Sequence, residues 1–113
     1  MNVGSLYKVK KYFWLIFPTK EIATDATRRL ARNPFLIFDF LPVAATAVVA
    51  ASYVNYCSRQ CNREVTYFSP DSIVVFLEND GELKKVLTSE GRIGWTGFDE
   101  SYNKCFEELK AEP

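Results

Sequence analysis

The stretch Pro34–Tyr56, with the sequence PFLIFDFLPVAATAVVAASYVNY, decides how the rest of this chain is interpreted. It carries one charged side chain, Asp39, and no charged residue occurs between Phe40 and Ser58. A bilayer core about 30 Å thick needs about 20 apolar residues in a helix that rises about 1.5 Å per residue. The stretch therefore predicts one transmembrane helix over residues 34–58.

Two other interpretations of this stretch are weaker. A helix buried in a soluble core is also apolar on all sides, but it needs a surrounding core, and the two flanks are polar. A cleaved signal peptide does not fit, because over thirty residues, with breaks at Pro18 and Pro34, precede the apolar run. The dense set of small residues between Ala44 and Ser52 favours packing of the predicted helix against another membrane helix.

The charges on the two sides of the predicted span differ strongly. Seven Lys and Arg residues stand against two acidic residues before it, and seven stand against eleven acidic residues after it. Basic flanks stay on the side from which a helix inserts. We therefore expect the N-terminus in the cytoplasm, the mitochondrial matrix or the stroma, with lipid headgroups bound at the basic flank. No recognition motif supports nucleic-acid binding.

Three segments are predicted along the chain. Residues 1–33 form a basic N-terminal flank. Its aromatic run at Tyr12–Phe17 is either an interfacial segment or a contact with a partner, and an amphipathic helix follows from Thr19 to Arg32. Residues 34–58 form the span, and the helix continues to about residue 63. Residues 59–113 form an acidic segment outside the membrane. The predicted fold class is a mostly α membrane protein with one transmembrane helix, an N-terminal amphipathic helix, and a small C-terminal β-hairpin plus a short helix.

The acidic segment contains short runs that are typical of strands. These runs cover residues 64–68, 72–77 and 82–87, and Asn79-Asp80-Gly81 is a hairpin signal between the last two. Residues 91–97 predict an irregular loop in which Trp95, with Phe98 after it, acts as a packing anchor. Residues 100–111 predict a final helix.

Few residues are candidates for chemistry, since the chain has no histidine. Asp39 is either a proton-relay carboxylate or a carboxylate at the membrane interface. Cys57, Cys61 and Cys105 are either free thiols in a packed interface or include one disulfide to Cys105. We predict no catalytic residue, no cofactor-binding residue, no metal site and no enzymatic activity.

In layout, this chain resembles the small single-span supernumerary subunits of mitochondrial respiratory-chain complexes. The resemblance lies in the basic N-terminal flank, the single span and the acidic segment beyond it, and no specific motif carries it. It implies an accessory subunit of the inner membrane, with its C-terminal segment in the intermembrane space, that stabilises a large electron-transport complex and binds its other subunits. The alternative is a single-pass anchor, adaptor or assembly factor whose C-terminal segment binds a partner.

Overall fold

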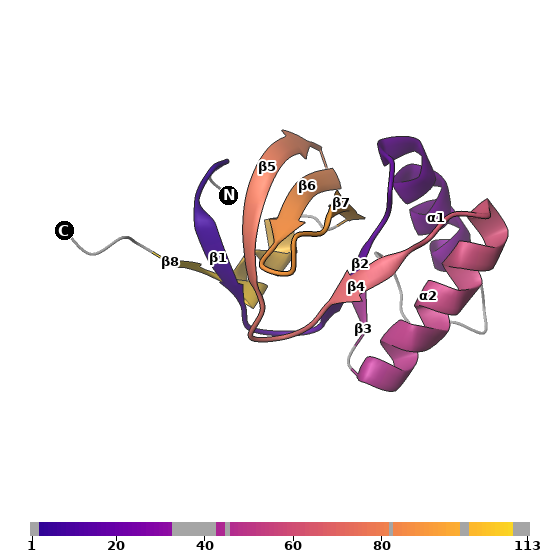
Figure 1. Cartoon of the computed structure of the whole chain (residues 1–113), viewed down its shortest axis with the longest axis horizontal. Coiled ribbons are helices and arrows are strands. Elements are labelled where there is room, and N and C mark those ends of the chain that lie inside the picture. The colour runs from indigo at the N-terminus through magenta and orange to yellow at the C-terminus, as the bar shows by residue number, and fades with distance from the viewer. Residues whose placement is uncertain (1–2, 33–42, 45, 82, 98–99, 110–113) are drawn as a thin grey trace.

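The computed structural model describes residues 3–32, 43–44, 46–81, 83–97 and 100–109. Within these residues the chain is mostly β, with two α-helices and one 3-10 helix. Figure 1 shows a five-stranded sheet at one end of the molecule, a small three-stranded sheet in the middle and the two helices at the other end. The eight strands are β1 (Leu6–Val9), β2 (Phe13–Ile16), β3 (Val43–Ala44), β4 (Thr66–Phe68), β5 (Ile73–Asp80), β6 (Leu83–Thr88), β7 (Ile93–Gly97) and β8 (Phe106–Leu109).

Both sheets are antiparallel along every described pair of strands. The larger one, sheet A, has the order β7-β6-β5-β1-β8, so the first strand of the chain lies beside the last. The smaller one, sheet B, has the order β3-β2-β4. The helices are α1 (Lys20–Arg32), α2 (Ala47–Cys61) and the 3-10 helix η1 (Glu100–Cys105).

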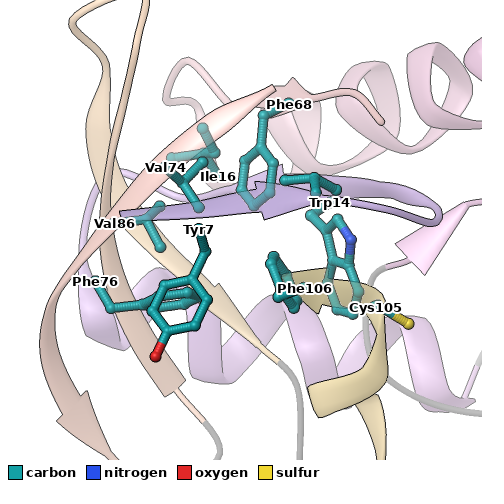
Figure 2. Close-up of a cluster of buried hydrophobic side chains, with 10 residues drawn as sticks. Tyr7, Trp14, Ile16, Phe68, Val74, Phe76, Val86, Cys105 and Phe106 are labelled. Atoms are coloured by element: carbon teal, nitrogen blue, oxygen red, sulfur yellow. The ribbon is translucent and has the colours of Figure 1, made fainter. Parts of the chain in front are cut away.

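Strand β2 is buried on both faces, and this explains its uninterrupted apolar sequence. Its Trp14 and Ile16 belong to the cluster that fills the space between the two sheets, which also contains Phe76 and Phe106 (Figure 2). The intervening Leu15, followed by Phe17, belongs to a second cluster beneath the helices. Because successive strand residues point to opposite faces, one short strand holds the two clusters together.

The predicted transmembrane helix is wrong. Residues 34–42, with Asp39 among them, lie outside the described residues, and residues 43–44 form strand β3. Helix α2 begins only after Thr46, whose side-chain oxygen accepts a hydrogen bond from the Val49 N–H at 3.3 Å, and it is 15 residues long. None of the helices in the described part of the chain is long and apolar enough to cross a bilayer.

Helix α2 is instead packed on one side against sheet B. Ala50, Tyr53 and Cys57 are buried on one face of it, while Ser52 and Asn55 are exposed. The spacing of the buried residues follows the helical repeat of a surface helix. The predicted fold class, the predicted membrane character and the predicted location in the mitochondrial inner membrane all rested on the span, and the structure contradicts them.

The smaller predictions had mixed outcomes. Helix α1 is confirmed, with the Thr19 hydroxyl accepting from the Ile22 N–H at 3.2 Å, and so are the strands β4, β5 and β6 and the hairpin turn at Gly81. The predicted loop over residues 91–97 is wrong, because it contains strand β7. The predicted final helix is also wrong, since the chain forms η1 and then strand β8.

Candidate protein-interaction surface

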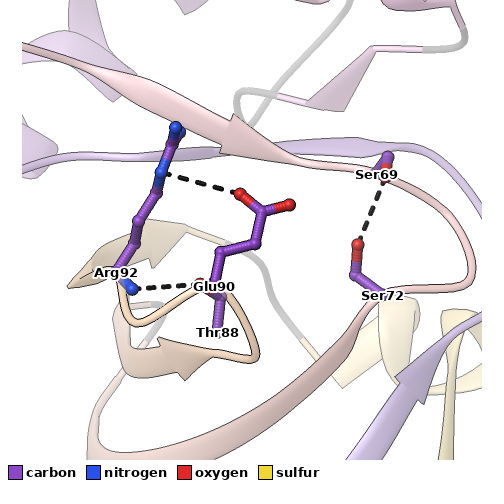
Figure 3. A network of polar contacts seen from close by, with 5 residues as sticks. All are labelled: Ser69, Ser72, Thr88, Glu90 and Arg92. Carbon is purple, nitrogen blue, oxygen red and sulfur yellow. Dashed lines mark hydrogen bonds and ion pairs between the residues drawn. The ribbon is translucent and has the colours of Figure 1, made fainter.

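Two open depressions lie on either side of Arg92, which lines both of them. One has a volume of about 460 Å³ and is lined in part by Ile16, Arg63 and Glu64, and the other has a volume of about 290 Å³ and is lined in part by Phe13 and Glu90. The Arg92 N–H donates to the Thr88 hydroxyl at 3.2 Å, and its Nε lies 3.8 Å from a Glu90 oxygen (Figure 3). Basic and acidic side chains occur there in equal number, so charge selects no ligand class.

Cys57 and Cys105 lie in different clusters, and neither lines these depressions. Cys57 is buried in the cluster beneath the helices, and Cys105 is buried in the cluster between the sheets. Both are free thiols. Burial raises the pKa of the Cys105 thiol, although Lys11 acts in the opposite direction. The side chain of Cys61 is outside the described part of the structure.

No metal centre forms within the described residues: nowhere among them do three or more His, Cys, Asp or Glu side chains come together. Trp95, predicted as a packing anchor, is half-buried against the cluster beneath the helices, and the Lys20 ammonium lies 6.0 Å from the centre of its ring. Phe98 is outside the described residues, as is Asp39.

The feature that distinguishes this molecule is the outer face of sheet A. The strand register places one apolar residue from each of the five strands side by side: Leu109, Leu6, Val75, Leu87 and Ile93. Residues directly opposite in an antiparallel ladder share a face. With strands about 4.8 Å apart, this apolar row extends for about 19 Å across the whole sheet.

The apolar row is accessible to solvent. Leu6 is 46% exposed and Ile93 is 57% exposed, while Val75, Leu87 and Leu109 are half-buried. The helices lie at the far end of the molecule from β1 and β8 (Figure 1), and α1 approaches sheet A at β6, at β7 and, through the ion pair of Lys20 with Asp80, at the end of β5. No described helix or strand therefore forms a layer over the row.

Charged residues flank the apolar row on the same face. Lys8 lies opposite Glu107 on one side of it, and Lys85 lies opposite Glu78 on the other. An apolar centre with a charged rim is the usual composition of a protein-binding surface.

Sequence reasoning missed this surface because it requires the pairing of the first strand with the last. The sequence pattern places Leu6 in the basic N-terminal flank and Leu109 in a predicted final helix. A local signal for strand β1 itself is the alternation of apolar and polar residues from Tyr7 to Lys10. Comparison of the chain with protein-family models, with curated proteins and with solved structures gives no match.

Proposed function

We propose that this chain is a non-catalytic accessory or adaptor protein that binds a partner protein through the outer face of sheet A. The observation that carries the proposal is the apolar row, which crosses all five strands and has no described layer over it. The partner is a protein that presents a complementary apolar surface.

The physical reason is the cost of leaving this surface in water. Burying apolar surface stabilises a complex by about 25 cal/mol for each Å² removed from water, before the costs of association are subtracted. Exposed apolar side chains that occur singly are ordinary, but five in register on one sheet form a continuous surface. The rigid sheet also fixes their positions before the partner arrives.

The molecule offers a matched control. Val48 on α2 is 76% exposed, and it lies on a helix at the other end of the molecule from β1 and β8 (Figure 1). It is therefore a large exposed apolar residue outside the proposed surface. A general tendency of apolar residues to stick to other proteins would affect Val48 as much as the apolar row.

The test uses site-specific photo-crosslinking in cells that express the chain. A crosslinking amino acid at Val75 or Leu87 should capture one defined partner, and the same group at Val48 should not. The purified partner should then bind the unmodified chain. Ile93→Lys should raise the dissociation constant of this complex at least about tenfold, whereas Val48→Lys should leave it unchanged. The proposal is wrong if Val48 and the apolar row capture the same proteins, or if Ile93→Lys leaves binding unchanged in a folded chain.

A further inference from the structure

We propose that the open edge of strand β8 pairs with an extended segment of another protein that carries the pattern apolar–basic–basic–apolar. This proposal names the class of partner for the surface described above, and it therefore rests on the proposed function. Its basis is the backbone geometry of β8, the charge of its two central residues and the end of the apolar row.

The first step concerns the backbone. In the described part of the chain, β8 pairs with β1 and is the last strand of sheet A. The Lys10 N–H donates to the Cys105 carbonyl at 2.7 Å, whereas the N–H and carbonyl of Val9 bond to Ser72 and Asp71 on the other side of β1. Because hydrogen bonding alternates along an antiparallel ladder, the backbone groups of Glu108 point toward the open side.

The second step concerns charge. β8 has the sequence FEEL, and its two central residues, Glu107 and Glu108, are acidic. Lys8 lies directly across the ladder from Glu107, but its Nζ is 3.7 Å from a carboxylate oxygen of Asp71. A strand added beside β8 would therefore meet two neighbouring carboxylates, and basic residues opposite them would be favoured.

The third step concerns the occupant. A second copy of β8, related by a two-fold axis at Glu108, would place Glu108 against Glu108, which is unfavourable. Leu109 is the end of the apolar row at this edge, so the residue opposite it in an added strand would extend the row. These conditions describe a partner segment with two basic residues between apolar ones, bound by strand addition.

The probe is an acetylated and amidated eight-residue peptide with Val-Lys-Lys-Val at its centre, compared with one that has Val-Glu-Glu-Val there. At low salt the unmodified chain should bind the basic peptide at least about tenfold more tightly than the acidic one, and added salt should weaken this binding. Nuclear magnetic resonance should show the largest amide shifts at Glu108 and Leu109.

The decisive variant reverses both charges, Glu107→Lys with Glu108→Lys. It should prefer the acidic peptide. Glu21→Lys changes an exposed acidic residue on helix α1, outside the proposed surface, so it is the control and should keep the original preference. If the double variant does not fold, the location of the amide shifts in the unmodified chain decides the question.

Three results would overturn the inference: equal binding of the two peptides, amide shifts away from β8, or dimerisation of the chain through this edge. Its failure is distinguishable from failure of the proposed function. If the peptides do not bind but a partner is still captured from Val75 or Leu87, the apolar row functions without strand addition. If the basic peptide binds at β8 but no partner is captured from the apolar row, the proposed function is wrong.

Discussion

Phe17 and Trp95 exchange two backbone hydrogen bonds, each 2.8 Å long, and thereby join the end of β2 to the middle of β7. This contact ties sheet B to the edge of sheet A. The close approach requires a glycine beside it. A methyl group on Gly94 would lie 2.4 Å from Cγ2 of Ile16 and 2.6 Å from the carbonyl oxygen of Phe17.

We therefore expect Gly94→Ala to lower the free energy of unfolding by at least about 2 kcal/mol, because one neighbouring atom belongs to the backbone and cannot turn away. Gly81→Ala is the control: it meets open space and has only the strain of a positive φ of 61°, which costs about 1 kcal/mol. Urea unfolding of both variants measures the difference. An equal loss in the two variants would show that the sheets do not need this close contact.

A second prediction concerns Thr96, which also lies in strand β7. Thr96 is fully buried, and its hydroxyl has no hydrogen-bond partner within the described structure. We expect Thr96→Val to raise the free energy of unfolding by about 1 kcal/mol, because valine has a similar shape and no buried hydroxyl. Thr88→Val is the matched change. It should lower stability by about 1 kcal/mol, since the Thr88 hydroxyl accepts the Arg92 N–H. A loss of stability in both variants would contradict the assignment for Thr96.

The alkaline limit of stability should depend on Tyr53. Burial against the sheet, with a smaller contribution from Cys57, raises the pKa of Tyr53 to about 12. The unfolded chain has an ordinary phenol pKa of about 10, so above this pH the unfolded state loses a proton that the folded state keeps. The stability from Tyr53 is therefore complete below about pH 10 and falls as the pH rises toward 12.

Tyr53→Phe should flatten this decline in stability between pH 10 and pH 12. Urea unfolding at a series of pH values measures this decline. Tyr7→Phe is the control, because it removes a buried phenol hydroxyl from the cluster between the two sheets. An identical alkaline decline in the unmodified chain and in Tyr53→Phe would refute the assignment.

The two buried cysteines should be protected from thiol reagents. We expect a chain carrying Cys61→Ser to react with a maleimide roughly 100-fold more slowly in the native state than in denaturant, because Cys57 and Cys105 become accessible only when the structure opens. Mass spectrometry of the two tryptic peptides over time measures each thiol separately. Rapid native labelling of Cys105 would show that η1 opens independently of the sheets.

The elements that the sequence predicts correctly are those specified by local signals. Thr19 begins α1, and Gly81 in its turn aligns β5 with β6, because a capping side chain and a positive φ act within a few residues. The errors lie where distant pairing decides the structure. The peptide from Phe106 to Leu109 has apolar residues at helical spacing, yet the open edge of β1 makes it a strand.

The stretch Pro34–Tyr56 gives the wrong prediction of a transmembrane helix for a related reason. Ala50, Tyr53 and Cys57 form a narrow buried face, but the small residues around them are compatible with lipid and with a half-exposed helix alike. Thr46 is a helix-capping residue inside the stretch, and it is a sequence signal that contradicts a continuous span. The apolar row has no comparable local signal, since it exists only after β1 is inserted between β5 and β8.

The insertion of β1 between β5 and β8 has a consequence for biosynthesis. A ribosome delivers residues 6–9 well before residues 73–80 and 106–109, which form their two neighbouring strands in the sheet. Until then residues 6–9 have no neighbouring strands to pair with, and their large side chains stay in water on the growing chain. The nascent polypeptide therefore completes sheet A only after residues 106–109 have left the ribosome, and until then a chaperone that shields residues 6–17 would keep their side chains from non-native contacts.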